Sequence, residues 1–485
     1  MRGVRHVVWV NPSGKPVPTD KPLEEVRKET TRYEALMIPL EPRKPESPWM
    51  QVTPGVVEAV RKLLAGQQYY EAHKGAYVGL NQVYFIEIRS RRPDGKLVIT
   101  NPLEPGQKKK VKQVEAVIEP DLVYPLIRGR DIRKWYVEFR DRYVIVPHDP
   151  KTARPLQESK LRVELPLTYS YLNSYRSELE NRPIHKLWGK GNPFFAIYDI
   201  GTYTFAPYKV VWKRIAGAIT GKAVSFACAV VEPIEGKPVV PDGSTAILVA
   251  ADSPEEAYYI AGFLNSTIAR AIIASYTYEL RQETHILDTI KVPKYDSQNE
   301  IHRKIAVLSR RAHELARCIY AGNKPEYCKD INAEKELESV ERELDLAVAR
   351  LLSLSEDCLR EFMNLMAILS GEELPAREEV ELPKEPKVSV LNTLLPPDVR
   401  SYVEVDVVNP SGEEVEFRYE FPWGEGSFRI VEGKHRVEVP PLKPGRYSGV
   451  LRYKWRGFEK VVGVVVEVSE TLGPRRRRGL LLGPG

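Results

Sequence analysis

Basic side chains on both sides of one glycine are the first residues whose chemistry suggests a role. Guanidinium and ammonium groups bind phosphate oxygens, and a guanidinium can also pair with the edge of a guanine. The Arg128-Gly129-Arg130 turn could bring two guanidiniums to such groups. The alternative is a tight turn in which the glycine adopts a positive φ and both arginines are solvated. We favour binding by one of the two arginines. The candidate binding residues are Arg128, Arg130, Arg133, Lys134, Lys209, Lys213 and Arg214.

Carboxylates, histidines and cysteines give weaker signals. Paired carboxylates beside a lysine can hold magnesium for phosphodiester hydrolysis. The Pro-Asp pairs at 93–94, 120–121 and 241–242 have no Glu-x-Lys placed after them on a strand, and no G-x-x-x-x-G-K-(S/T) phosphate loop is present. The four cysteines contain no C-x-x-C pair, so a zinc site or a disulfide framework is not expected. A structural role is expected for three histidines: His73, His148 and His285. We therefore predict no catalytic, cofactor-binding or metal-binding residue.

The elements that must position the basic residues are mostly strands. Short β-branched and aromatic runs separated by turn residues fill 69–295, which predicts a β-rich region with a few helices. Ser253-Pro254-Glu255-Glu256 predicts a helix start, because serine caps, proline suits the first turn and acids favour the N-terminus. Apolar residues spaced by three and four across 301–319 and 337–351 predict two antiparallel helices. Trp188, Phe205 and Trp212 are expected in the core.

These patterns predict an α+β chain with six parts. The parts are a leader or linker (1–48), a β-rich domain (49–296), a helical hairpin (297–371), a Glu- and Pro-rich linker (372–386), an immunoglobulin-like β-sandwich (387–470) and a basic disordered tail (471–485). A length of 485 residues suits two to four domains.

The charge is unevenly distributed. The net charge is +6, yet residues 105–222 hold 22 lysines and arginines against 12 aspartates and glutamates, together with many aromatic residues. Basic and aromatic side chains together favour nucleic acid, whereas a solvated basic face is the alternative. The lysines at 108–110 are interpreted as a solvated loop. With no apolar leader and no membrane-length run, a soluble cytoplasmic protein is expected. Few methionines and many charged residues hint at a thermophilic source.

Several motifs, in a fixed order, resemble a known family. Glu119–Ile132 contains Pro125-Leu126-Ile127-Arg128-Gly129-Arg130-Asp131-Ile132, which resembles the "P-L-x-R-G-x-D-I" turn of the TaqI-like specificity region in type II and IIG adenine-specific DNA methyltransferases. Five further segments resemble the same region: 70–84, 171–195, 201–213, 255–266 with Asn265-Ser266, and 285–293, which would form the closing strand. The resemblance covers roughly residues 49–370.

The resemblance implies a larger enzyme. Such methyltransferases also need a domain that binds the methyl donor and an (N/D)-P-P-(Y/F/W) loop that holds a flipped adenine. The Gly-rich turn expected in the donor-binding domain and the (N/D)-P-P-(Y/F/W) loop are both absent from this sequence. Asn192-Pro193-Phe194-Phe195 comes nearest to the loop but lacks the second proline. We interpret that tetrapeptide as non-catalytic. Asn265-Ser266 is interpreted as a helix end.

The sequence therefore predicts a specificity chain of an adenine-N6 methyltransferase or restriction–modification system. The chain would clamp double-stranded DNA against a methyltransferase subunit, and possibly a nuclease subunit, with S-adenosylmethionine bound on the catalytic partner. It is not expected to be catalytic alone. Two alternatives stay open: an intact methyltransferase or nuclease with an unrecognised active site, and a scaffold protein of a defence complex.

Overall fold

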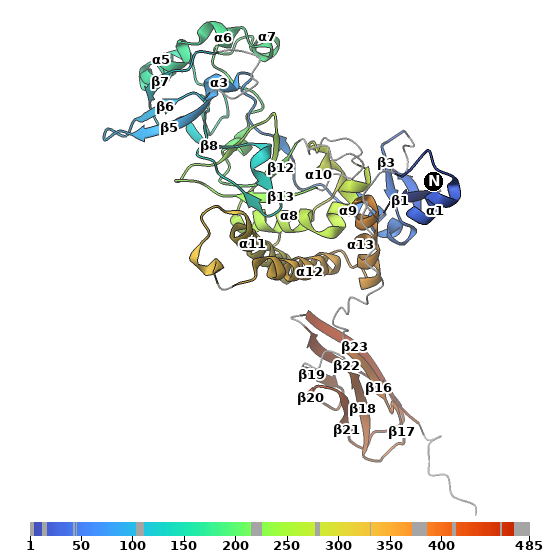
Figure 1. Ribbon diagram of the computed structural model, residues 1–485. Helices are drawn as coiled ribbons and strands as arrows, with labels where there is room; N and C mark the ends of the chain where they lie inside the picture. Colours follow the sequence, from blue (N-terminus) through green and yellow to red (C-terminus); the bar gives the residue numbers. More distant parts are fainter. Residues whose placement is uncertain are drawn as a thin grey trace, which may run out of the picture. The chain divides into compact units, whose positions relative to one another are not determined.

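The computed structural model divides the chain into two compact units, Met1–Pro375 and Ala376–Gly485 (Figure 1). It describes residues 4–11, 17–41, 44, 46–102, 111–214, 226–276, 282–329, 331–370, 386–409, 414–455 and 458–469. The lysines at 108–110, nearly all of the expected linker 372–386 and the expected tail 471–485 lie outside these residues. Helices and strands are mixed throughout, as the α+β prediction requires. Among the described residues, no helix is both long and apolar enough to cross a membrane.

The first residues form a small sheet, whereas the sequence predicted a leader. Strands β1 (Val4–Val10), β2 (Thr31–Pro39) and β3 (Trp49–Val52) pair antiparallel in that order, and helix α1 (Leu23–Glu29) connects β1 to β2. Met50 and Val52 of β3 are fully buried in the largest core of the chain. The segment is structured because its apolar residues join that core.

A six-stranded sheet carries the first motifs. Its order is β14 (Val240–Pro241), β8 (Val123–Ile127), β11 (Tyr143–Ile145), β5 (Phe85–Arg91), β6 (Leu97–Thr100) and β7 (Glu115–Ile118). Five short helices lie in the same part of the chain: α3 (Asn81–Tyr84), α4 (Glu158–Glu164), α5 (Pro166–Asn173), α6 (Arg176–Glu180) and α7 (Pro183–Trp188) (Figure 1). Strand and helix residues share one core, which contains Ile86, Val144, Leu172 and Phe195.

A four-stranded sheet carries the remaining motifs. Its order is β13 (Cys228–Val231), β12 (Tyr208–Lys213), β15 (Ala246–Ala251) and β4 (His73–Lys74). The elements that follow are helices α8 (Pro254–Asn265), α9 (Thr267–Tyr276) and α10 (His285–Thr289), and helix α2 (Val57–Leu64) contributes to the same core. As expected, Ser253 caps α8, since its Oγ accepts a hydrogen bond from Glu256 N at 3.1 Å. The strand expected at 285–293 is absent, because its first half forms α10.

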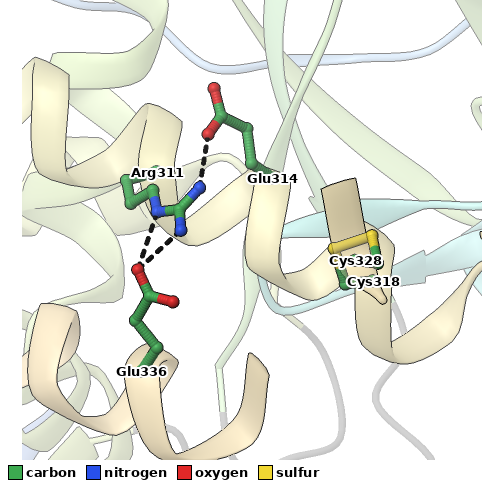
Figure 2. Close-up of a disulfide and its surroundings, with 5 residues drawn as sticks. All are labelled: Arg311, Glu314, Cys318, Cys328 and Glu336. Atoms are coloured by element: carbon green, nitrogen blue, oxygen red, sulfur yellow. Dashed lines mark hydrogen bonds and ion pairs between the residues drawn. A yellow bond between two sulfur atoms is a disulfide. The ribbon is translucent and has the colours of Figure 1, made fainter. Parts of the chain in front are cut away.

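Helices α11 (Glu300–Tyr320), α12 (Ala333–Leu351) and α13 (Glu356–Ser370) end the first unit. Lys304 pairs with Glu343 at 3.8 Å and Arg311 with Glu336 at 2.6 Å, so α11 and α12 run antiparallel. A disulfide joins Cys318, near the end of α11, to Cys328 in the short 3-10 helix η4 (Glu326–Cys328). Figure 2 shows the Arg311–Glu336 pair and the disulfide. No disulfide framework was expected from the sequence, because the four cysteines contain no C-x-x-C pair. The ten-residue separation of Cys318 and Cys328 gave no local signal for this pairing.

The second unit consists of two sheets around one core. One sheet has the order β16 (Lys387–Leu391), β18 (Ser401–Val408), β21 (Gly433–Val439). The other has the order β17 (Leu394–Leu395), β23 (Phe458–Val468), β22 (Gly445–Trp455), β19 (Val415–Phe421), β20 (Gly424–Ile430). Alternate residues of both sheets point inward, among them Val403, Val405, Phe417 and Val466. Alternation of buried and exposed residues in β18 and β19 matches the pattern in the sequence.

Candidate nucleic-acid interface

The Arg128-Gly129-Arg130 turn is a short 3-10 helix, η2 (Gly129–Asp131), held against the loop between β14 and β15. The Gly129 amide donates a hydrogen bond to Thr245 Oγ1 at 2.9 Å, and Thr245 Oγ1 donates to Asp242 Oδ2 at 3.0 Å. A β carbon on residue 129 would lie 2.4 Å from the Thr245 carbonyl oxygen. The φ of Gly129 is not in the left-handed region, so the positive φ of the alternative interpretation is not found. Glycine is required at position 129 because its backbone lies too close to the backbone of Thr245 for a side chain to fit.

The loop at 241–245 also forms backbone hydrogen bonds with residues in or next to two other motif segments, and we call this meeting of segments the crossing. The Ala76 amide donates to the Pro241 carbonyl at 2.8 Å, and the Gly243 amide donates to the Ala76 carbonyl at 2.9 Å. A β carbon on Gly75 or Gly243 would lie little more than 2 Å from the opposite backbone, at 2.2 and 2.1 Å respectively. The Arg214 amide closes the crossing by donating to the Thr245 carbonyl at 2.9 Å. Segments far apart in sequence therefore meet at 241–245.

Arg128 lies inside this crossing. Its side chain is 19% exposed, and its Nε lies 3.4 Å from Oδ2 of Asp242, which is almost fully buried. Its amide donates to Asp131 Oδ2 at 2.7 Å. Asp131 is buried, which raises the pKa of its carboxyl despite the hydrogen bond from Arg128 and the nearby arginines. Arg128 therefore neutralises a buried carboxylate and is poorly placed for an external ligand.

Arg130 and Arg133 are the candidates that the turn presents to solvent. The Arg130 side chain is 52% exposed, with its Nε 3.9 Å from Asp131 Oδ1. Arg133 is exposed at the end of strand β9 (Ile132–Arg133), which pairs with β10 (Tyr136–Val137). Its guanidinium lies 5.2 Å from the centre of the Tyr320 ring, at the end of α11. Exposed guanidiniums on a rigid turn can meet phosphate or base edges without moving the backbone.

Two lysines and one arginine proposed from the sequence form contacts within the chain. Lys209 is fully buried in β12, its Nζ donates to the Ala206 carbonyl, and burial lowers its pKa to about 7. Lys134 pairs with Glu341 of α12 at 2.7 Å. Arg214 binds Glu283 through Nε and Nη2, each 2.9 Å from Glu283 Oε1. Lys209 is therefore buried and Lys134 is paired within the chain, whereas Lys213 is half-buried at the end of β12.

Other predicted residues divide between core and surface. Trp212 is fully buried and Phe205 is partly buried, as expected. Trp188 is 70% exposed, so its expected core position is wrong. Helix α7 buries none of its residues, so nothing covers this ring among the described residues. Phe194 and Phe195 of the Asn-Pro-Phe-Phe segment are buried in the core.

His148, His73 and Asn265 have structural contacts, whereas His285 is exposed at the start of α10. His148 is buried, accepts from the Ile197 amide at 3.2 Å, and has its pKa lowered to about 4 by burial. His73 stacks on Tyr203 with 3.8 Å between ring centres. Asn265 donates to the Cys228 carbonyl at 2.8 Å and accepts from the Cys228 amide at 3.0 Å, so it fastens α8 to β13. Ser266 is the C-cap of α8. No group of three or more potential metal ligands occurs among the described residues.

Two arginines, one beside the turn and one in the core of the six-stranded sheet, have roles that were not predicted from the sequence. Arg140 is 45% exposed and its Nε lies 3.0 Å from Asp131 Oδ1, which places a third arginine beside the turn. Arg182 is fully buried, and its guanidinium donates to the carbonyls of Leu179, Val78, Phe194 and Ala196 at 2.6–2.9 Å. A signal for Arg140 was available, because Arg140-Asp141-Arg142 lies in the basic segment. Nothing local indicates that Arg182 is buried.

Part of the chain is similar in sequence to a known protein. The chain is 27% identical over 167 residues to the type II methyltransferase M.NspV of Nostoc sp.. Over these residues it is homologous to a type II methyltransferase. The match takes in 33% of this chain and 31% of that relative's length. No family model matches. The type IIL restriction-modification enzyme MmeI, whose structure was solved in complex with DNA, aligns with a TM-score of 0.36 and 10% identity over 62% of this chain and 36% of MmeI.

Proposed function

We propose that this chain is a DNA sequence-recognition chain of an adenine-N6 methyltransferase or restriction–modification system. The residues of the Arg128–Asp131 turn carry the proposal. Gly129 and Thr245 fix the turn at a crossing of three motifs, and Arg130 and Arg133 face solvent on it. Homology over 167 residues to a type II methyltransferase and the excess of basic residues across 105–222 support the same function.

In this proposal, the chain clamps double-stranded DNA against a catalytic subunit that binds S-adenosylmethionine. Arg130 and Arg133 contact phosphates or base edges, with Arg140 and Lys213 as neighbouring cations. Arg128 and Arg214 support the recognition surface through their ion pairs with Asp242 and Glu283. The second unit is proposed to be an immunoglobulin-like β-sandwich. The cytoplasmic location and the thermophilic source expected from the sequence remain proposals.

The test compares two exposed arginines with one buried lysine. The double variant Arg130→Ala/Arg133→Ala removes two phosphate contacts, so binding of a fluorescent duplex should weaken. The slope of log K against log salt should fall by about 2, because each contact contributes about 0.9. Lys209→Met is the matched control, since Lys209 is buried and should leave DNA affinity unchanged. An unchanged slope in the double variant would reject these contacts.

A further inference from the structure

A groove beside the recognition turn has no assigned role. Two adjoining hollows of about 410 and 450 Å³ lie between β10, β13 and the last turns of α11. They share four lining residues: Glu232, Tyr258, His313 and Arg317. Each hollow is within the 300–1,000 Å³ typical of small-molecule sites. The groove therefore has room for a ligand of the size of a mononucleotide.

The floor of the groove is apolar and its walls are aromatic. Ile127, Val137, Val230 and Val239 line the floor of the larger hollow. The aromatic residues around it are Tyr136, Phe139, Tyr258 and the buried Trp135. Tyr136 and Tyr258 are only partly buried. The Arg310 guanidinium lies 4.9 Å from the centre of the Tyr258 ring and the Tyr320 ring lies 5.9 Å from that of Tyr136, so a ligand would meet the remaining ring surface. Such walls favour a planar ring, because every nucleobase presents a π face for stacking.

Arg317 supplies the positive charge of the groove. It is exposed on α11, and no ion pair to it occurs among the described residues. The neighbouring arginines are committed, since Arg310 lies 3.1 Å from Glu255 and Arg311 lies 2.6 Å from Glu336 (Figure 2 shows the Arg311 pair). An arginine left without a carboxylate at the rim of a groove suits a phosphate, which its planar fork binds in two places.

The remaining polar groups of the groove restrict the chemical class of its ligand. His313 accepts from the Val230 amide at 2.9 Å and lies 2.7 Å from the Ser309 carbonyl, so both ring nitrogens are occupied. Burial also lowers its pKa to about 4, and it is neutral near pH 7. Glu232 accepts from Tyr258 Oη at 3.0 Å and keeps acceptor capacity for a base amino group. Arg310 and Glu314 also line the smaller hollow, but they are paired with Glu255 and Arg311. The cation Arg317, the acceptor Glu232 and the aromatic walls match a phosphate, an amino-bearing base and its ring.

We propose that this groove binds a nucleotide, with the base against Tyr136 and Tyr258 and the phosphate on Arg317. The nucleotide has two sources, a free mononucleotide or a nucleotide unstacked from bound DNA. The second source rests on the proposed function, because β10 continues from the turn that carries Arg130 and Arg133. The disulfide at Cys318, next to Arg317, fixes the end of α11 that forms the rim.

The first arm of the test uses free ligands and the full chain. Calorimetric titration with AMP, GMP, CMP and dTMP, and with inorganic phosphate alone, should show at least one nucleotide binding more tightly than phosphate. Arg317→Gln and Tyr136→Leu should each weaken that binding tenfold or more. Arg303→Gln is the control, since it removes an equal charge from an exposed position at the start of α11. Circular dichroism checks that each variant is folded.

The second arm uses duplex DNA containing 2-aminopurine, whose fluorescence rises when the base unstacks. A rise with the wild-type chain that is lost in Arg317→Gln assigns the groove to a nucleotide of DNA. Nucleotide binding without this rise assigns it to a free nucleotide. No binding in either arm, or variants that behave like wild type, overturns the site. Nucleotide binding by a chain that binds no duplex would reject the proposed function and leave the site standing.

Discussion

The Gly129 amide and the Thr245 side chain form the contact on which the recognition turn rests. The hydrogen bond between them is 2.9 Å long, and the Thr245 carbonyl is so close that no β carbon fits on residue 129. Arg130 follows this glycine directly, so the contact also sets where its guanidinium emerges. A glycine that looks like a flexible turn residue in the sequence is therefore a fixed packing point.

Gly129→Ala tests this packing point. The new methyl group must displace the backbone of residue 245, and such overpacking costs about 1–3 kcal/mol. We expect urea unfolding of the first unit to show a loss of this size, together with weaker DNA binding. Gly322→Ala is the control, because a β carbon there meets nothing within 4 Å. Equal stability of the two variants would contradict the close approach.

Arg182→Met tests the buried arginine. The substitution keeps most of the side-chain volume and leaves the carbonyls of Val78, Phe194 and Ala196 without their donor. Leaving a buried carbonyl without its donor costs on the order of 1–3 kcal/mol, so the loss should be at least of this size. Arg162→Met, at an exposed position of α4, should change the free energy of unfolding by less than about 0.5 kcal/mol. A small effect at both positions would mean that water replaces the lost donors.

The Cys318–Cys328 disulfide should stabilise the loop that leads from α11 to α12. Closing a loop of this length constrains the unfolded chain by about 3 kcal/mol in the chain-entropy model. We expect Cys318→Ser/Cys328→Ser to unfold at a lower temperature than the oxidised wild type. Dithiothreitol should lower the wild type to the level of the variant and leave the variant unchanged. A wild type that does not respond to reduction would show that the bond does not form.

Two buried histidines predict acid sensitivity. Burial lowers the pKa of His148 and of His313 to about 4 in the folded chain, whereas an unfolded histidine titrates near 6.5. Between these values the unfolded chain binds more protons, so stability is fully present above pH 6.5 and falls as the pH drops toward 4. The loss is on the order of 3 kcal/mol for each histidine. His148→Gln should unfold with a shallower acid dependence than the wild type, and an identical dependence would contradict the assignment.

Local signals predicted the local features well. The serine cap of α8 and the buried Trp212 follow from short patterns around Ser253 and along β12. Features that depend on distant partners were not predictable. Lys134 needs Glu341, more than two hundred residues away in sequence, and Lys209 is buried in β12, the strand that β13 and β15 pair with on either side. The sheet at the N-terminus has the same origin, since β3 is held by a core built from later helices.

The candidate site shows the same division. The arginine-rich turn was visible in the sequence, but its neighbours decide which arginine is available. Arg128 forms an ion pair with Asp242, which lies in the loop after β14. Arg133 lies over the ring of Tyr320 at the end of α11. Residue spacing in the sequence does not predict these two contacts, because they join segments that are far apart in the chain and meet only in the folded structure.

Selection from a random pool of duplex DNA tests the central claim most directly. The purified chain, alone and with a methyltransferase subunit, is incubated with the pool at about 150 mM salt, and bound duplexes are sequenced through several rounds. The proposed function predicts one enriched sequence, bound at least roughly a thousandfold more tightly than random duplex, and no enrichment by Arg130→Ala/Arg133→Ala. Retention of duplex without any sequence preference, or no retention at all, would contradict a recognition role for this chain.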